Sequence, residues 1–297
     1  MAWRGLHLTQ PARLSYADGQ LVVSREDGEI TTSIEDIGWL VLDTPQVSIS
    51  LPVINACMEA GVAIITTDAR HHPSGLTLPF HRHHRQAAVA ILQVETGAPL
   101  KKRLWQRIVQ AKIINQSAVL RADGAGSAPL GEMARLVRSG DPENVEARAA
   151  RAYWAALWPD FRRQDETDLR NTMLNYGYAI LRAVIARALV AAGLLPCLGL
   201  HHASDQNPFN LADDLIEPFR PLVDRAVIKL CQSGGEKAGR LELQHRRVLA
   251  ALPLTEVKIG KETMTVLHAA EATATSLVRA LESSSAAVLK LPELARS

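Results

Sequence analysis

The sequence predicts an α+β protein, with a β-rich N-terminal domain over residues 1–85 and a larger all-α C-terminal domain over residues 86–297. Up to about residue 80, short runs rich in Val and Ile are separated by turn residues, which is the pattern of strands. From about Gln86 onward, apolar residues recur at the spacing of helices instead. At 297 residues, the chain is long enough for two domains that each bury a core.

The first predicted element is a β-hairpin. Apolar and polar residues alternate over residues 14–16 and again over 21–23. Between these runs, Asp18-Gly19 is typical of a tight hairpin turn. We therefore expect two strands joined by this turn.

Two buried strands with one helix between them are predicted next. Residues 37–42 and 62–66 are short, largely apolar runs rich in Val and Ile. Between them, Ser50 can cap a helix that has Pro52 in its first turn and that ends at Gly61. This helix should lie against the sheet.

The rest of the chain predicts a linker and then packed helices. Residues 68–79 break the periodicity and are expected to form a loop. Helical spacing follows over residues 104–120, 153–158 and 173–195. The third run contains arginines that would each cost roughly 2.5 to 3.5 kcal/mol in a bilayer, so it predicts a buried helix and no membrane partner. A serine run after Leu281 favours a frayed tail.

Composition narrows the classes of function. The 33 basic and 31 acidic residues give a net charge of only +2, so any nucleic-acid surface must come from local clustering. The three cysteines are scattered and lack the short spacing of a zinc site, which argues against a disulfide framework and favours the cytoplasm. The N-terminal segment lacks the continuous apolar core of a signal peptide.

The stretch from 198 to 224 contains the strongest indication of a functional site. Two adjacent histidines stand a short loop before a group of acids that opens a new helix. Carboxylates and imidazole in this arrangement are a plausible shell for a hard divalent metal. These residues are His201, His202, Asp213, Asp214 and Glu217.

Two of these acids, Asp213 and Glu217, also have a structural explanation. If Asn210 caps the helix, Asp213 can accept bonds from free backbone amides in its first turn. Pro218 should kink the helix and restrain Glu217 before it, as suits a metal ligand. An ion pair between Glu217 and Arg220 is the alternative, and the pattern leaves both open.

The histidines must divide their roles, because two adjacent side chains cannot both face one site in a regular element. One is expected to be a ligand, and the other to pack or to cap a helix end.

A further candidate lies upstream, in a helix predicted to begin near Asp141-Pro142. Glu143 is explained as a partner of the helix dipole. Glu146 lies deeper in the helix. It precedes Tyr153 by about two turns, so the two side chains share one face of the helix, and Glu146 can point into the core.

Several segments together resemble the CRISPR-associated integrases of spacer acquisition, the Cas1 family. They are NVEARAARAYW, LGLHHASDQNPFNLADDLIEPFRPLVD and, more loosely, KKRLWQRIVQAKIINQSAVL and VAIITTDARHHPSGLTLP. The Asn-Pro-Phe-Asn turn is most similar to members from type II systems. The resemblance implies an N-terminal β-sandwich followed by a helical domain. By motif, it implies that Glu146, His202 and Glu217 are the catalytic metal ligands, with His201 as the alternative register and Asp214 as a supporting acid.

The resemblance also implies an activity and its partners. The 3′-hydroxyl ends of a captured double-stranded DNA fragment would attack the CRISPR repeat in a transesterification that uses Mg²⁺ or Mn²⁺, with endonuclease activity on branched DNA. The protein would be a homodimer that assembles with a small Cas2 subunit. A non-catalytic DNA-binding assembly subunit and a stand-alone branched-DNA nuclease stay open as alternatives. Candidate DNA contacts are Arg148, Arg151, Arg220, Lys258, Arg82 and Arg85.

Overall fold

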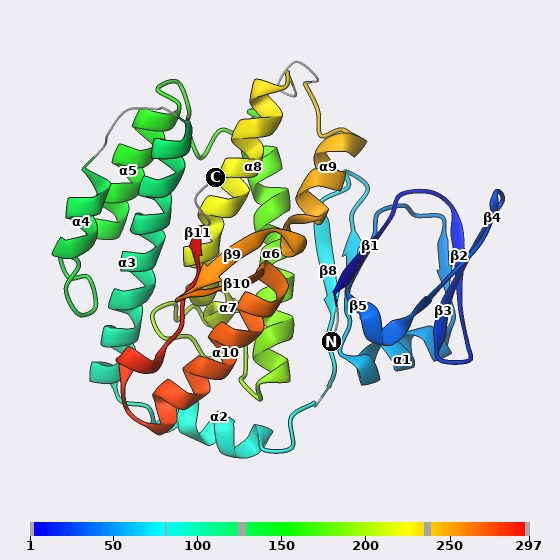
Figure 1. Ribbon diagram of the computed structural model, residues 1–297, viewed down its shortest axis with the longest axis horizontal. Coiled ribbons are helices and arrows are strands. Elements are labelled where there is room, and N and C mark those ends of the chain that lie inside the picture. The colour runs from blue at the N-terminus through cyan, green and yellow to red at the C-terminus, as the bar shows by residue number, and fades with distance from the viewer. Residues whose placement is uncertain (1–2, 81, 124–128, 235–238, 295–297) are drawn as a thin grey trace.

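The N-terminal part of the computed structural model contains two four-stranded sheets. The structure describes residues 3–80, 82–123, 129–234 and 239–294, and Figure 1 shows a strand-rich part beside a larger helical part. One sheet has the order β1-β5-β7-β8, with β1 Arg4–Leu8, β5 Ile37–Leu42, β7 Ala63–Thr67 and β8 Pro73–Thr77. The other has the order β4-β3-β2-β6, with β2 Ala12–Ala17, β3 Gln20–Arg25, β4 Gly28–Ser33 and β6 Val47–Ile49.

These elements confirm the predicted hairpin, both predicted strands and the helix between them. Strands β2 and β3 pair antiparallel across Asp18 and Gly19, whose φ values of 49° and 77° suit a tight turn. A 3-10 turn at Ile34–Asp36 precedes β5. Helix α1 (Leu51–Ala60) follows β6 and ends at Gly61, whose φ of 72° is a left-handed conformation that glycine adopts without strain.

The expectation of a loop over residues 68–79 is wrong in part, because β8 occupies Pro73–Thr77. This strand pairs antiparallel with β7 at the edge of its sheet. An edge strand tolerates proline and glycine, and those residues hid its periodicity in the sequence.

The remainder of the chain is mostly helical. Its helices are α2 Gln86–Glu95, α3 Ala98–Asp123, α4 Leu130–Leu136, α5 Val145–Leu157, α6 Leu169–Ala191, α7 Asn210–Ile216, α8 Arg220–Gln232, α9 Leu243–Ala250 and α10 Val266–Glu282. Short 3-10 turns lie at Glu217–Phe219 (η2), Leu252–Leu254 (η4) and Ala286–Val288 (η5). Helix α6 is long and apolar enough to cross a membrane by length and composition, yet 83% of its most apolar window is buried, as a core helix requires.

The prediction that strands stop after residue 85 is wrong. Strands β9 (Glu256–Ile259), β10 (Glu262–Thr265) and β11 (Glu293–Leu294) form a small antiparallel sheet in the order β10-β9-β11. The predicted frayed tail is wrong for the described residues up to 294, because Leu289 and Leu294 are buried in the core, and residues 295–297 lie outside the described part. Strands of two to four residues are too short to show a period against the helical pattern around them.

Two apolar cores organise the described residues. One lies between the two N-terminal sheets and α1, with residues such as Leu14, Ile37 and Cys57. The other fills the helical part and also takes in Trp39 and Ile65 from the other face of the β5-β7 sheet. The N-terminal sheet is therefore packed directly on the helical part. The sandwich description and the boundary near residue 85 stay predictions.

Candidate metal and DNA site

Glu217 lies at the break between α7 and α8. Pro218 cannot continue the hydrogen bonding of α7, so the chain passes through the 3-10 turn Glu217–Phe219 before α8 begins. The turn holds Glu217 in the interior, where its residue is 6% exposed. The predicted kink at this acid is therefore present, and so is the alternative partner: Arg220 Nε donates to Glu217 Oε1 at 2.8 Å.

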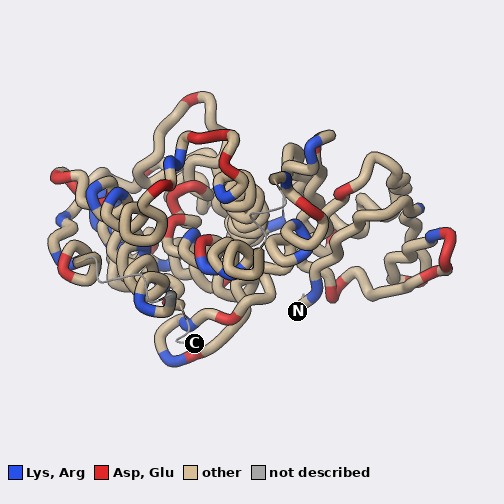
Figure 2. The backbone as a smooth tube through the Cα atoms, turned by 90° about the horizontal axis from the view of Figure 1, so that it is seen from above, with Lys and Arg blue, Asp and Glu red and all other residues tan. Residues whose placement is uncertain are grey.

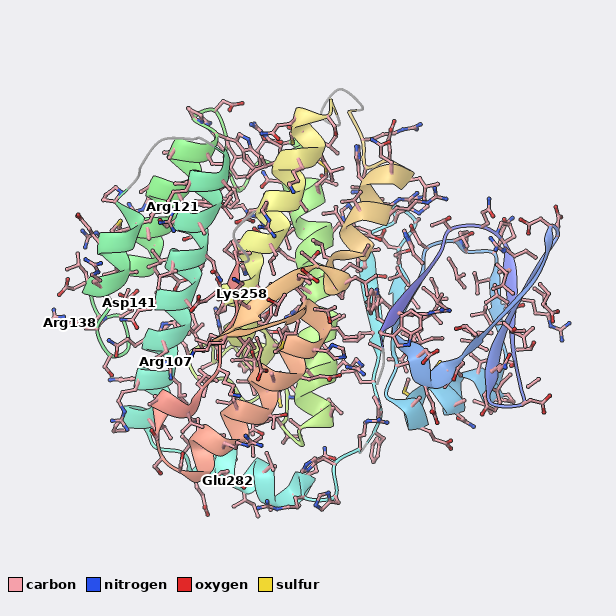
Figure 3. All side chains as sticks on the ribbon, viewed as in Figure 1. Arg107, Arg121, Arg138, Asp141, Lys258 and Glu282 are labelled. Carbon is pink, nitrogen blue, oxygen red and sulfur yellow. The ribbon has the colours of Figure 1, made fainter. Side chains whose placement is uncertain are left out.

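Glu146 is the second residue of α5. The predicted start of this helix near Asp141-Pro142 is wrong, because α5 begins at Val145. Asp141 lies before the helix (Figure 3), where its two carboxylate oxygens accept the backbone N–H groups of Val145 and Glu146, each at 2.9 Å. Glu143 thus precedes the helix and instead pairs with Arg138 at the surface. The cap on Asp141 fixes the point from which the Glu146 side chain leaves the backbone.

Lys112 of α3 joins these two distant acids. Its ammonium donates to Glu146 Oε1 at 2.6 Å and lies 2.5 Å from Glu217 Oε2. All three side chains are largely buried, with exposed fractions of 12% for Lys112, 24% for Glu146 and 7% for Glu217. The fold therefore brings Glu146 and Glu217 to one cation position, and that position is held by a lysine.

The charges at this point keep both groups ionised. Burial alone would raise the pKa of Glu217, but Lys112 and Arg220 lower that pKa to about 2. Burial alone would lower the pKa of Lys112, and Glu217 and Glu146 raise it instead. Glu217 is therefore a carboxylate and Lys112 an ammonium at neutral pH.

Asp214 shapes the histidine loop. Its buried carboxylate accepts the backbone N–H groups of Leu200 at 2.6 Å and of His201 and His202 at 3.1 Å, and it also binds His202 Nδ1 at 2.7 Å. A side chain at Gly199 would collide with this turn, because a Cβ there would lie 2.1 Å from the carbonyl oxygen of His202. Asp214 therefore fixes the histidine loop, and its role as a supporting acid of a metal site stays a prediction.

The two histidines have different surroundings. His201 stacks on Trp105 of α3, with ring centroids 4.2 Å apart and the rings parallel. His202 is 43% exposed, and its Nδ1 contact with Asp214 leaves Nε2 as the nitrogen available to a ligand. The hydrogen bond with Asp214 raises the pKa of His202, and the charge of Glu217 raises it further.

The described residues do not contain a preformed group of three His, Cys, Asp or Glu side chains that could hold a metal ion. The structure brings Glu146 and Glu217 together at Lys112. His202 interacts with Glu217 electrostatically, because the negative charge of Glu217 raises the pKa of His202. The donor set still fits a hard cation: two carboxylates share one cation position, and a carboxylate orients the neighbouring imidazole.

Asp213 and Asn210 do not act as predicted. Asn210 is the first residue of α7, and its side chain binds the backbone of Cys197 and Ser204 instead of capping the helix. Asp213 forms a two-pronged ion pair with Arg182, with both bonds at 2.7 Å. Both residues fix the loop before α7 to its surroundings, a role that spacing along the chain did not indicate.

Asp224 is a buried acid that the sequence analysis did not identify, and it contacts residues that neighbour the site. Asp224 of α8 accepts hydrogen bonds from Tyr178 and, at 3.0 Å, from Tyr153. Burial raises the pKa of Asp224 to about 6, although both hydrogen bonds act in the opposite direction. The guanidinium of Arg220 lies 4.6 Å from the centre of the Tyr178 ring. Tyr153, on the same helix as Glu146, is buried in the core, as predicted.

The candidate DNA contacts are distributed over several elements. Arg148 and Arg151 are exposed on the helix of Glu146, and Lys258 is exposed on β9 (Figure 3). Arg82 donates to the carbonyl of Glu59, and Arg85 forms an ion pair with Glu282 at 3.3 Å. Figure 2 shows basic and acidic positions interspersed along the chain rather than divided between two sides. Their role in DNA binding stays a prediction.

The residues that the sequence analysis missed lack a local signal. Lys112 is one basic residue among many on a long helix, and Asp224 is one acid within an apolar run. The partners of both come from distant segments, so only the packing of α3, α5, α6 and α8 reveals them.

Comparison with known proteins identifies a family. A sequence profile described as "CRISPR associated protein Cas1" matches residues 6–250. The chain belongs to the Cas1 family. It is 38% identical over 296 residues to the CRISPR-associated endonuclease Cas1 of Neisseria meningitidis serogroup C (strain 8013), covering 99% of this chain and 97% of that protein. The predicted likeness to type II members is consistent with this match.

Solved structures show the same Cas1 fold. A casposase bound to an integration product aligns with a TM-score of 0.78 and 20% identity, covering 96% of this chain and 91% of that one. A Cas6-RT-Cas1–Cas2 complex aligns with a TM-score of 0.74 and 20% identity, covering 97% of this chain and 36% of that one. The relatives found by sequence are named CRISPR-associated endonucleases, and the solved structures show the fold.

Proposed function

We propose that this Cas1-family protein is the metal-dependent DNA integrase of CRISPR adaptation. It joins the 3′-hydroxyl ends of a captured DNA fragment to the CRISPR repeat by transesterification, and it cleaves branched DNA as an endonuclease. The observation that carries the proposal is the convergence of Glu146 and Glu217 on one cation position, beside a histidine oriented by Asp214.

Glu146, Glu217 and His202 would hold Mg²⁺ or Mn²⁺, which supplies polarisation of the phosphodiester and stabilisation of the charge that develops on its oxygens. Asp214 keeps the imidazole of His202 oriented through Nδ1. Arg220 neutralises Glu217 Oε1 and adds positive charge where a DNA phosphate must approach. In the reaction, a bond forms between the 3′-oxygen and phosphorus, and the bond from phosphorus to the 3′-oxygen of the target strand breaks. The attacking hydroxyl loses a proton and the leaving 3′-oxygen gains one, so the protons balance. The transfer is direct, and no residue of the protein forms a covalent bond to the DNA.

The proposed partners are double-stranded DNA, a second copy of this chain and a small Cas2 subunit, in the cytoplasm. Support comes from the structural neighbours, which include a protein bound to its integration product and a Cas1–Cas2 complex. Because the chain is nearly neutral overall, phosphate contacts must come from local groups such as Arg148, Arg151 and Arg220.

The test is a strand-joining assay with the full chain and its partner subunit. A labelled fragment with a free 3′-hydroxyl is incubated with a repeat-containing target, with Mg²⁺ or Mn²⁺ present or chelated. We expect joined product only with metal, and loss of joining in the Glu217→Ala protein because the cation position loses one carboxylate. Glu143→Ala, an exposed glutamate just before α5, is the matched control and should join normally.

Full joining by the Glu217→Ala protein would contradict this assignment. DNA binding that is independent of metal, without joining or cleavage, would instead identify an assembly subunit in which Lys112 and the acids are only structural. Cleavage of branched DNA without a stable joined product would identify a stand-alone nuclease.

A further inference from the structure

Lys112 occupies the cation position that the proposed function assigns to a divalent metal. Its Nζ lies 2.6 Å from Glu146 Oε1 and 2.5 Å from Glu217 Oε2, so it contacts both acids at once. The pair with Glu217 is not a solvated surface ion pair, because Lys112 is 12% and Glu217 7% exposed. The contact therefore matters for the charge balance of the interior.

The second oxygen of Glu217 has a separate partner. Arg220 Nε binds Oε1, whereas Lys112 faces Oε2. The two cations thus divide the carboxylate between them, and the oxygen facing Lys112 shares that ammonium with Glu146 Oε1. A divalent ion shared by Glu146 and Glu217 would need this oxygen, and it could bind there while the Arg220 contact stayed in place.

An ammonium and a divalent ion cannot share the position. Mg²⁺ binds carboxylate oxygens at about 2.0–2.1 Å, so an ion between the two acids would occupy the space of the Lys112 nitrogen. Two positive charges a few ångströms apart in a largely buried site also repel each other strongly. Lysine is suited to leave, because its charge sits at the end of a flexible four-carbon stem.

We propose that Lys112 is a built-in counter-ion, which holds Glu146 and Glu217 together before a divalent ion binds and is displaced when the ion enters. The inference rests on the proposed metal site and adds a step to it. The lysine keeps two buried acids from repelling each other in the metal-free protein, and metal binding exchanges one cation for another. The affinity for the metal then depends on the competition between Lys112 and the metal ion for the carboxylates of Glu146 and Glu217.

The test measures Mn²⁺ binding to the full-length protein by calorimetric titration, without DNA. Lys112→Met keeps an unbranched side chain and removes the charge. We expect this variant to bind Mn²⁺ at least about tenfold more tightly than the unaltered protein, which corresponds to ~1.4 kcal/mol. Its melting temperature should also rise more on addition of Mn²⁺, because its metal-free state has lost the counter-ion. Lys102→Met, at an exposed lysine of the same helix, is the control and should match the unaltered protein.

A second measurement uses the unaltered protein, so it does not depend on whether Lys112→Met folds. An amine-reactive label followed by mass spectrometry reports how accessible each lysine is. We expect labelling of Lys112 to increase several-fold when Mn²⁺ is added, while labelling of Lys102 stays constant. Unchanged labelling of Lys112, or an equal or weaker Mn²⁺ affinity of Lys112→Met, would overturn the exchange.

The Glu217→Ala protein separates the two proposals. If it binds Mn²⁺ as well as the unaltered protein does, the metal site itself is wrong, and the exchange falls with it. If it loses Mn²⁺ binding while Lys112→Met binds as the unaltered protein does, the metal site stands and only the exchange is wrong.

Discussion

At the scale of single residues, the candidate site depends on acids that are fixed by specific donors. Asp214 accepts three backbone N–H groups and contacts His202, and Asp141 accepts two N–H groups at the start of α5. Asp224 accepts two tyrosine hydroxyls behind the site. Asp141 and Asp214 thus fix the backbone or the ring that positions a proposed ligand, and Asp224 fixes two tyrosines packed near them.

Replacement of Asp224 by asparagine tests this support. The amide has one acceptor oxygen, so one of the two tyrosines loses its acceptor, at a cost of about 1–3 kcal/mol near pH 4. The folded-state pKa of about 6 lies above the ordinary value of 3.8, so the folded protein holds the proton more tightly. The contribution to stability is therefore fully present below pH 3.8 and is lost as the pH rises through about 6.

The free energy of unfolding, measured in urea from pH 4 to pH 7, checks this expectation. The difference between the unaltered protein and Asp224→Asn should shrink toward neutral pH. Asp205→Asn, at an exposed aspartate before α7, is the control. Parallel pH curves for the two proteins would contradict the buried titration.

At the scale of elements, α3 connects the proposed ligands to the C-terminal strand. One turn after Lys112, the buried side chain of Asn115 donates to the carbonyl of Pro218 at 2.8 Å and to that of Pro292 at 3.0 Å. Its oxygen accepts the N–H of Leu294 at 3.1 Å. One amide thus holds both the turn that carries Glu217 and the strand β11.

We expect Asn115→Asp to loosen both contacts, because a carboxylate cannot donate to two carbonyl oxygens. Leaving these groups unsatisfied costs about 1–3 kcal/mol each. The strand-joining assay should show a lower kcat with little change in the KM for the DNA fragment, since Glu217 is displaced and the DNA contacts are not. Limited proteolysis should show faster cleavage near the C-terminus.

Gln106→Glu is the matched control for this prediction. Gln106 lies on the same helix and donates to the carbonyl of Val137 at 2.7 Å, away from Glu217. This variant should lose stability without faster cleavage near the C-terminus. The same cleavage rate in Asn115→Asp and in the unaltered protein would show that Asn115 does not hold β11.

At the scale of the whole molecule, the N-terminal sheet is joined to the helical part by polar contacts as well as by a shared core. Asp43, at the end of β5, is 1% exposed and binds His7, His71 and Arg246 at 2.8–2.9 Å. Arg246 belongs to α9, so this acid connects the sheet with the helices. The indole N–H of Trp39 adds a hydrogen bond to the carbonyl of Ala250 at 3.1 Å.

Asp43→Ala should destabilise the protein by about 3–5 kcal/mol, because it leaves the buried guanidinium of Arg246 without its carboxylate. Asp27→Ala, at a surface aspartate in a 3.7 Å contact with Arg25, should cost only about 0–1 kcal/mol. Tryptophan fluorescence during urea unfolding measures both, since Trp39 and Trp105 belong to the shared core. Equal midpoints for the two variants would show that the Asp43 contacts do not hold the parts together.

The sequence predicted those features whose physical cause is local. Alternation around Asp18-Gly19 specifies a hairpin, helical spacing specifies α3, α5 and α6, and Pro218 specifies a break after Glu217. Motif resemblance indicated the family, and the profile and the Neisseria relative confirm it. The proposed ligands Glu146, His202 and Glu217 were named in the same way, and their function stays a proposal.

Only the tertiary structure decided what surrounds those residues. The partners of Glu217 are Lys112 from α3 and Arg220 from α8, and the strand β11 joins the local pair β9-β10 from further along the chain. Hydrogen bonds and ion pairs act over a few ångströms in space, whereas the sequence records distance along the chain. The sequence by itself determined which chemical groups the site can use, and the packing of α3, α5 and α8 decided that its two acids meet at a lysine.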